Sequence, residues 1–277
     1  MPRLYSAAVL GALALALTWS GVWPFCGLVM LAGLAMCWEW GRLVGTDHPA
    51  RRRFSGLAAP TIGHGIAVAA AAVLTGLGMP GFGIAVLLAA ALAGTLALDR
   101  SQADPGPPFW ALGVLYVGLT AVSLIWLRAD PTHGLQAVLL VFLAVWTTDI
   151  AAYVAGRTIG GARLAPRISP GKTWSGLAGG VAASALACAA FVWAAPDAAA
   201  GRLGVLGALL AVAAQAGDLA ESALKRRFGV KDASQLIPGH GGILDRVDGL
   251  VTAAIVAAGI GLWLNPAAPG RALLTGF

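Results

Sequence analysis

Charged residues are scarce in this chain: Asp, Glu, Lys and Arg make up 11% of its 277 residues, whereas 58% are hydrophobic. Cysteine is scarce too. The three cysteines, Cys26, Cys37 and Cys188, fall in apolar stretches without a shared spacing, which argues against a disulfide or zinc pattern. The sequence has no fixed-period repeat, no low-complexity linker and no polar stretch long enough for a soluble domain. These absences, with a mean hydropathy of +0.81, indicate a polytopic membrane protein.

Apolar stretches long enough to cross a bilayer recur along the whole chain. They predict an all-α fold, a polytopic transmembrane helix bundle with about nine spans. Alanine, leucine and glycine dominate these stretches, and such small side chains let helices approach closely. We interpret 1–277 as one integral membrane domain, with N-terminal spans in 1–130 and motif-bearing spans in 131–277. The expected spans are 4–20, 22–38, 57–78, 80–98, 108–127, 134–156, 174–195, 202–217 and 249–264, of which the last two are short.

The net charge of +6 and the pI near 9.8 could suggest a nucleic-acid partner, but the positive charges sort by loop. With the N-terminus inside, only Arg128, Arg202 and Arg271 of the 18 Lys and Arg residues fall in outer segments. This strong positive-inside bias argues against nucleic acid and predicts a cytoplasmic N-terminus in the plasma (inner) membrane. It also places the segments 157–173 and 218–248 on the cytoplasmic face, where we expect the active site.

One segment, Asp218–Asp248, departs from the apolar composition, because it holds a third of the chain's charged residues. Desolvating so many charges is costly unless metal ions, phosphates or water compensate. The segment is therefore the first candidate for a functional site. Its acids are Asp218, Glu221, Asp232, Asp245 and Asp248, and its bases are Lys225, Arg226, Arg227, Lys231 and Arg246.

The spacing of four polar residues in this segment predicts a shared helical face. Asp218, Glu221, Ser222 and Lys225 lie at i, i+3, i+4 and i+7, so they lie together if the helix of the eighth span continues. The face presents two carboxylates, a hydroxyl and an ammonium. Carboxylates suit a hard cation such as Mg²⁺, and the ammonium suits a phosphate.

A turn separates this face from a second acidic face. The run Pro238–Gly242 cannot be regular helix, and its three glycines allow the backbone to approach a ligand closely. His240 is a candidate base or metal ligand, or else a histidine hydrogen-bonded within the turn. Asp245 and Asp248 follow at i and i+3 as the ninth span begins. Acids for a metal and bases for phosphates, at the inner face of a membrane, favour nucleotide chemistry on a lipid.

Three upstream features concern the same membrane face. Asp149 lies inside the sixth span, where a carboxylate is costly, so we expect it to face a cavity or a cation; the alternative is hydrogen bonding to neighbouring threonines. The run Ser169–Gly171 predicts a helix start capped by its serine, with Lys172 and Thr173 in the first turn as an anion site. The alternative is an ordinary capped span with a topology-setting lysine. Glu39, between two tryptophans, is interpreted as an interfacial anchor, with a lipid portal as the alternative.

The charged segment resembles the signature of the CDP-diacylglycerol synthase (phosphatidate cytidylyltransferase) family. It reads S-x-L-K-R, four residues, K-D, then P-G-H-G-G-x-x-D-R-x-D, with every fixed position filled. Asp149 with the following A-Y, the G-R pair and the I-S-P-x-K-T-W loop are similar to that family too. The loop departs from the family's S-P-K-K-T-W-E-G at Gly171 and Ser175, so it has one cation and one acid fewer.

The resemblance implies transfer of the CMP moiety of CTP to phosphatidic acid, giving CDP-diacylglycerol and pyrophosphate for phospholipid biosynthesis. It implies Mg²⁺ dependence, with K⁺ as a candidate second cation, surrounding membrane lipids and a homodimer as a candidate assembly. It assigns catalytic roles to Asp218, Lys225, Asp245 and Arg246, and metal binding to Asp218, Asp245 and Asp248. The expected substrate-binding residues are Asp149, Ser169, Lys172, Thr173, Ser222, Arg226, Lys231, Asp232, His240, Gly241 and Gly242.

Two other classes of function compete with this one. Another lipid cytidylyltransferase or a lipid kinase would act on a different substrate, and the complete signature argues against the kinase. A secondary transporter would bind a cation with acids near the membrane midplane and would have inverted-topology halves. The sequence shows no such halves, and its charges fall at the inner interface.

Overall fold

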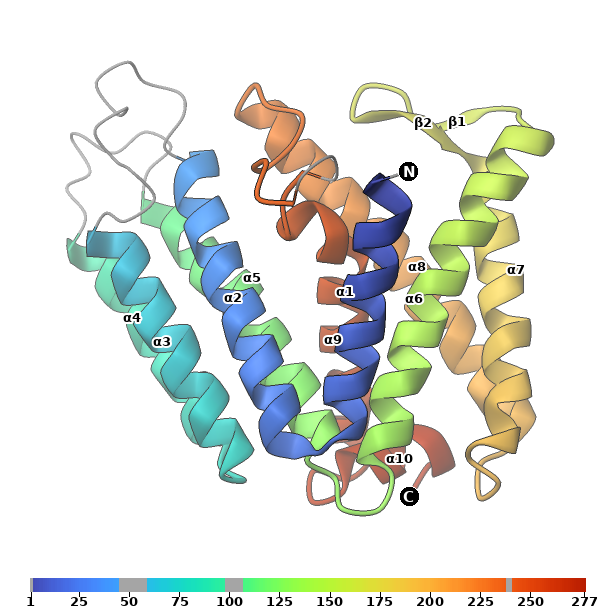
Figure 1. The fold of residues 1–277 in the computed structure, drawn as a ribbon, viewed down its shortest axis with the longest axis horizontal. Helices are drawn as coiled ribbons and strands as arrows, with labels where there is room; N and C mark the ends of the chain where they lie inside the picture. Colours follow the sequence, from blue (N-terminus) through green and yellow to red (C-terminus); the bar gives the residue numbers. More distant parts are fainter. Residues whose placement is uncertain (1, 45–58, 98–106, 238–240) are drawn as a thin grey trace. The chain divides into compact units, whose positions relative to one another are not determined.

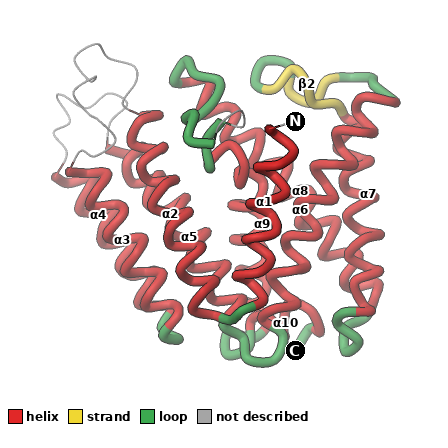
Figure 2. Tube along the Cα trace, in the orientation of Figure 1, coloured by secondary structure: helices red, strands yellow, loops and turns green. Residues whose placement is uncertain are grey.

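The computed structural model describes residues 2–44, 59–97, 107–237 and 241–277, which are mostly helical (Figures 1 and 2). Among these residues, six helices are long and apolar enough to cross a membrane. Two shorter apolar helices, Thr61–Gly76 and Pro80–Leu96, accompany them. The predicted all-α bundle is confirmed, whereas the total of about nine spans is only roughly supported.

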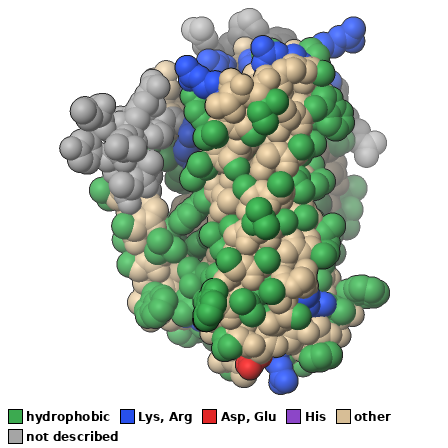
Figure 3. Space-filling view, turned by 90° about the vertical axis from the view of Figure 1, so that its right-hand side faces the viewer, with side chains coloured by type: hydrophobic (Ala, Val, Ile, Leu, Met, Phe, Trp, Pro, Cys, Tyr) green, Lys and Arg blue, Asp and Glu red, His purple; other side chains and the backbone are tan. Residues whose placement is uncertain are grey.

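Many outward-facing side chains of these helices are apolar. Ile150, Leu186 and Val205 are 67%, 73% and 62% exposed. Hydrophobic side chains (green) are spread over the face seen in Figure 3, and Lys and Arg side chains (blue) lie toward its ends. Exposing such side chains to water is costly, so this surface suits the hydrocarbon core of a bilayer. The chain is an integral membrane protein.

The chain forms two compact units, of which the first comprises Met1–Trp126 and Lys225–Val247. Within this unit Trp40 is buried, and its Nε1 donates to the Phe109 carbonyl oxygen at 2.9 Å. A Cβ on Gly113 would overlap the Trp40 indole, so this glycine lets two helices approach closely. The helices are α1 (Pro2–Trp19), α2 (Val22–Val44), α3 (Ala59–Gly76), α4 (Pro80–Ala97) and α5 (Pro107–Arg128), whose last turn enters the second unit.

The second unit comprises Leu127–Leu224 and Asp248–Phe277. Its elements are α6 (Gly134–Thr158), β1 (Arg163–Ala165), β2 (Ser169–Thr173), α7 (Trp174–Ala190), the 3₁₀ helix η2 (Phe191–Trp193), α8 (Ala200–Arg227), α9 (Leu244–Leu264) and α10 (Pro269–Thr275). Helices α8 and α9 contribute residues to both units. Small residues bring α6 and α7 together, since a Cβ on Gly176 would lie 2.8 Å from the Ala152 carbonyl oxygen.

The segment before α7 differs from its prediction. It forms β2, which pairs antiparallel with β1, so Ser169 is not the helix cap and Lys172 is not in the first turn. Thr173 is the N-cap instead: its backbone is extended, and its Oγ1 accepts from the Gly176 N–H at 3.0 Å. The Ser-Pro-Gly signal is a local one, and pairing with β1 outweighs it.

Helices α8 and α9 extend beyond the predicted apolar spans. Helix α8 has 28 residues and continues through the polar stretch to Arg227, because Ala, Glu, Lys and Arg favour helix as strongly as the apolar residues before them. Helix α9 has 21 residues and begins at Leu244. The four residues predicted to share a helical face all lie within α8, as expected.

A buried carboxylate ties the loop before α6 to the start of α10 in the second unit. Asp130 is 5% exposed, and its Oδ1 accepts from the N–H groups of Thr132 and His133, both at 2.9 Å. Its Oδ2 accepts from the Arg271 N–H at 2.9 Å. Burial raises the pKa of this carboxyl, but the hydrogen bonds outweigh burial and hold the pKa below its ordinary value. Asp130 is therefore a charged structural link.

Candidate active site

Asp245, in the first turn of α9, connects three parts of the signature segment. Its Oδ1 accepts from Lys225 Nζ at 2.7 Å, and its Oδ2 accepts from the N–H groups of Ala233 at 2.9 Å and Gly242 at 2.8 Å. The Asp245 side chain is only 3% exposed. The carboxylate therefore closes the loop between α8 and α9 and holds the Lys225 ammonium in place.

A second carboxylate, Glu39 of α2, holds the same loop. Its Oε1 accepts from Ser234 Oγ at 2.6 Å and the Ile243 N–H at 2.9 Å, and its Oε2 accepts from the Leu244 N–H at 2.7 Å. Glu39 is fully buried. The prediction that it is an interfacial anchor is wrong, because its carboxylate binds backbone and hydroxyl groups far away in the sequence.

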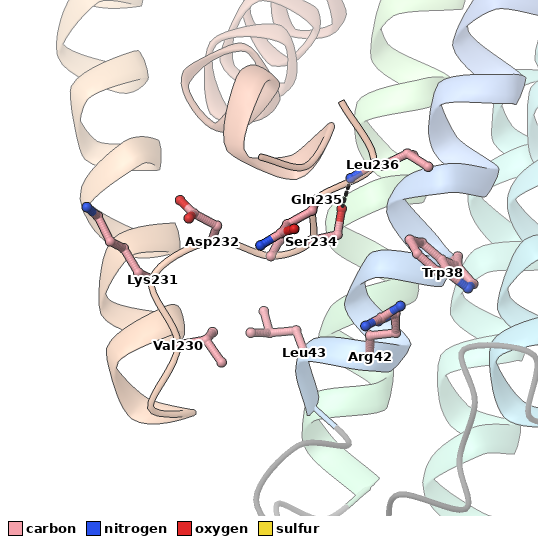
Figure 4. A pocket seen from close by; sticks show the side chains of 10 residues that line it. Trp38, Arg42, Leu43, Val230, Lys231, Asp232, Ser234, Gln235 and Leu236 are labelled. Atoms are coloured by element: carbon pink, nitrogen blue, oxygen red, sulfur yellow. Dashed lines mark hydrogen bonds between the residues drawn. The ribbon is translucent and has the colours of Figure 1, made fainter. Parts of the chain in front are cut away.

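A cavity of about 730 Å³ opens beside this loop in the first unit (Figure 4). Trp38 and Arg42 of α2 lie on one side of it and Lys231 on the other. The Arg42 guanidinium carbon lies 4.9 Å from the centre of the Trp38 ring. Asp232 and Gln235 add polar groups to the lining. The volume falls in the range of about 300–1,000 Å³ typical of small-molecule sites, and the two cations favour an anion.

In the second unit, Lys172 links β2 to α8. Its Nζ lies 2.6 Å from Asp218 Oδ2 and donates to Gln215 Oε1 at 3.0 Å. Ser222 Oγ donates to the other Asp218 oxygen at 3.3 Å. The Lys172 and Asp218 side chains are 17% and 28% exposed, so a ligand can reach this ion pair.

Asp218 also belongs to a concentration of negative charge. Asp248 of α9 interacts electrostatically with Asp218, Glu221 and Asp149. Glu221 is buried, whereas Asp149 is exposed on the surface of α6. Carboxylates repel one another strongly where water is partly excluded, so this group favours a bound cation.

The acids of the two units differ in how well they fit the Mg²⁺ that the resemblance implies. Asp218 and Asp248 have oxygen lone pairs beyond those used by Ser222, Lys172 and the Gly249 N–H, and carboxylate oxygens are the ligands Mg²⁺ prefers. Asp245 accepts from Lys225 and the Ala233 N–H at Oδ1 and from the Ala233 and Gly242 N–H groups at Oδ2, so a metal there would compete with more donors than at Asp218. Within the described residues, no group of three or more His, Cys, Asp or Glu side chains is arranged as a metal site.

Two predicted residues of β2 have structural partners. Ser169 lies at the far end of the strand from Lys172, where it pairs with Ala165. The Thr173 hydroxyl serves as the cap of α7, and the Trp174 N–H donates to the Ala162 carbonyl oxygen. The first N–H groups of α7 are therefore partly occupied, which weakens the predicted anion site at this helix start.

The remaining predicted residues lie in or near the loop between α8 and α9. Gly241 has a φ of +84°, which favours glycine, and its carbonyl oxygen accepts from the Ile237 N–H at 2.9 Å. Arg226 Nη1 donates to the Val230 carbonyl oxygen at 3.4 Å, and Arg246 is exposed. His240 lies outside the described residues.

Sequence reasoning did not assign Glu39, Gln215 or Ser234 to the site. One signal was available for the first two: an acid at the end of one apolar span and an amide inside another, where burial without a partner is costly. Ser234 carries no such signal, because it falls between the fixed positions of the signature in a stretch without periodicity.

An apolar helix bundle with paired acids and bases and a polar cavity defines an integral membrane protein with a candidate ligand site. The chain belongs to the family described as the cytidylyltransferase family, which matches residues 1–262. It is 42% identical over 260 residues to a phosphatidate cytidylyltransferase of Brucella suis biovar 1 (strain 1330), covering 91% of this chain and 89% of the relative. It is 37% identical over 251 residues to a protein of the same name from Pseudomonas aeruginosa, covering 86% of each chain. Another of that name, from Haemophilus influenzae, is 46% identical over 129 residues, or 45% of each chain.

Proposed function

We propose that this protein transfers the CMP moiety of CTP to phosphatidic acid, giving CDP-diacylglycerol and pyrophosphate. The observation that carries the proposal is the acid–base pairing of motif residues: Lys225 with Asp245 and Lys172 with Asp218. Relatives named phosphatidate cytidylyltransferase, which match most of the chain, support the choice of substrates.

In this reaction a phosphate oxygen of phosphatidic acid attacks the α-phosphorus of CTP. A new P–O bond forms, and the bond from that phosphorus to the oxygen bridging toward the β-phosphorus breaks, so pyrophosphate leaves. A phosphate monoester has a second pKa of about 6, so the lipid is largely dianionic at neutral pH and needs no strong general base. The main barrier is the repulsion between the dianion and the triphosphate, which fixed positive charge and in-line positioning lower.

Lys172 and Lys225 supply positive charge from fixed positions. Each ammonium is paired with a carboxylate, and an incoming phosphate competes with that carboxylate for the ammonium hydrogens. The carboxylates keep the lysines oriented before substrate arrives, which reduces the ordering cost of binding. We assign Arg226 and Arg246, which flank the same loop, to further phosphate contacts.

The cavity beside α2 suits CTP. Arg42 and Lys231 on its two sides are positioned for the triphosphate, and Asp232 and Gln235 offer hydrogen-bonding groups to the ribose or the base. Its lining contains both charged and apolar groups, as a nucleotide with a flat base requires.

Asp218 and Asp248 would hold Mg²⁺, which when bound screens phosphate charge and stabilises the leaving pyrophosphate. Asp149 adds negative charge that favours a second cation such as K⁺, and Asp245 stays a proposed metal ligand within the first unit. The same reasoning on charge supports a site and N-terminus at the cytoplasmic face of the plasma (inner) membrane, where CTP is available. A homodimer is proposed by analogy alone.

The test uses the purified protein in detergent with labelled CTP, phosphatidic acid and Mg²⁺. We expect lipid-soluble CDP-diacylglycerol and one pyrophosphate per turnover, and none of either after the metal is chelated. Asp218→Asn should abolish turnover, whereas Asp197→Asn, at an acid whose side chain is 75% exposed, should not. Release of CDP would point to a lipid kinase, and preference for an isoprenoid phosphate would point to another cytidylyltransferase. Wild-type turnover in Asp218→Asn would contradict the metal assignment.

A further inference from the structure

We infer that Glu39 is a positioning residue that holds the signature loop from α2. The inference rests on the proposed function, because the importance of the loop for turnover is taken from it. Glu39 lies about 200 residues away in sequence from the groups that it binds, so no local motif contains this contact. Its fully buried carboxylate has no role in the chemistry described above.

The Glu39 carboxylate binds the loop on both sides of its glycine turn. Before the turn, Ser234 Oγ donates to Oε1 at 2.6 Å, and this hydroxyl in turn accepts from the Leu236 N–H at 3.0 Å. After the turn, the N–H groups of Ile243 and Leu244 donate at 2.9 and 2.7 Å. These N–H groups stand at the start of α9 and have no acceptor within the helix. A negative charge at a helix N-terminus is also favoured by the helix dipole.

The hydrogen bonds from Ile243 and Leu244 to Glu39 also fix the position of Asp245. Leu244 immediately precedes Asp245, so the Glu39 contact sets the direction from which the Asp245 carboxylate reaches Lys225 and the Ala233 N–H. Two carboxylates from different helices thus hold one loop. If the bond at Leu244 is lost, the first turn of α9 can fray, and the Lys225 ammonium loses its fixed partner.

Gly242 supports the same inference. Its N–H donates to Asp245 Oδ2 at 2.8 Å, and a Cβ at this position would lie 2.8 Å from Glu39 Cδ. Because Glu39 is held by three hydrogen bonds, it cannot move aside cheaply. Only glycine therefore fits at position 242, between the carboxylates of Glu39 and Asp245. This packing explains why the second residue of the G-G pair is glycine.

Glu39→Gln preserves side-chain volume but removes one acceptor. Three donors converge on the carboxylate, whereas an amide offers one acceptor oxygen and one NH₂ group. With the oxygen facing Ser234 and Ile243, the NH₂ group must face the Leu244 N–H, donor against donor. The variant therefore loses a charge-assisted bond at the residue next to Asp245.

Asp130→Asn is the matched control. Asp130 is also a buried carboxylate that accepts from N–H groups, including that of Arg271 at the start of α10, and no step of the proposed reaction uses it. The measurements are kcat and KM for CTP, thermal stability in detergent, and hydrogen exchange of the segment 233–245. We expect Glu39→Gln to lower kcat by about tenfold or more and to speed exchange at Ile243 and Leu244. Asp130→Asn should lower thermal stability at least as much while kcat stays within about twofold of wild type.

Wild-type kcat together with unchanged exchange in Glu39→Gln would overturn the inference. Equal losses of kcat in Glu39→Gln and Asp130→Asn would also overturn it, because both would then reflect stability alone. If Glu39→Gln does not accumulate in cells, Ser234→Ala is tested in its place. A fall in kcat smaller than that expected for Glu39→Gln, together with faster hydrogen exchange, supports the inference. Wild-type kcat and wild-type exchange refute it. A wild-type protein that makes no CDP-diacylglycerol would refute the proposed function, while the exchange measurement would still decide the role of Glu39.

Discussion

Gly217→Ala should impair turnover by pushing α8 away from α9 next to Asp218. A Cβ on Gly217 would overlap Thr252 Oγ1 and lie 2.7 Å from the Asp248 carbonyl oxygen, about 0.7 Å short of the 3.4 Å at which ordinary contacts begin. The backbone contact cannot be relieved by a side-chain rotation. The shift also strains the 2.7 Å hydrogen bond from Thr252 to the Ala213 carbonyl oxygen. Overpacking of this kind costs about 1–3 kcal/mol, only partly offset by about 1 kcal/mol of helix propensity gained by alanine.

The same shift displaces Asp218 relative to Asp248, and a misplacement of about 1 Å can cost on the order of 100-fold in rate. We therefore expect CDP-diacylglycerol formation to fall by roughly 10- to 100-fold, with a modest loss of thermal stability in detergent. Gly201→Ala is the control in the same helix, because nothing lies within 4 Å of its added Cβ. It should retain full activity. A fully active Gly217→Ala, or equal losses in both variants, would refute the reasoning.

Three further predictions concern single side chains. Lys172→Met should lower kcat/KM in steady-state assays by about 10- to 100-fold, because it removes a charge-assisted contact and leaves Asp218 without its ion-pair partner. Lys172→Arg should lose less. Arg42→Ala should raise the KM for CTP by about tenfold and should change the KM for phosphatidic acid less. A larger effect on the KM for phosphatidic acid would indicate that the cavity binds the lipid phosphate instead of CTP. Asp130→Asn should lower the free energy of unfolding by about 1.5–3 kcal/mol at neutral pH. Folding lowers the pKa of Asp130. The carboxylate therefore contributes its full stabilisation of the folded protein above the ordinary aspartate pKa of about 3.9, and this contribution disappears as the pH falls through the lowered pKa. Melting curves of wild type and Asp130→Asn should converge there, and a constant difference down to low pH would contradict this.

The helices could be predicted from sequence because apolar length alone specifies them in a membrane. The helical face from Asp218 to Lys225 was equally predictable, since the helix period determines which residues share a face. The start of α7 was not: the Ser169 run has the local signal of a cap, but its backbone groups pair with β1, a tertiary contact.

The partners of Glu39 could not be predicted for a related reason. Flanking tryptophans suggest an interface, and its true partners, such as Leu244, come about 200 residues later. Similarly, metal binding by Asp245 is what the family resemblance implies, and it stays a prediction. The structure shows that backbone amides and Lys225 already use both of its oxygens. Spacing in sequence identifies which groups are available, but only the fold shows which of them are already in use.

The close approach of α6 and α7 leaves no room for a hydrocarbon chain between them. Added Cβ atoms on Gly176 and Gly180 would lie 2.8 Å and 3.0 Å from carbonyl oxygens of α6, so the two backbones are nearly in contact along this seam. A methylene group needs about 3.5–4 Å from each neighbouring atom. No hydrocarbon chain can slide between these two helices without prising them apart. The tails of a membrane lipid therefore stay outside this helix pair, in the surrounding bilayer or along another surface.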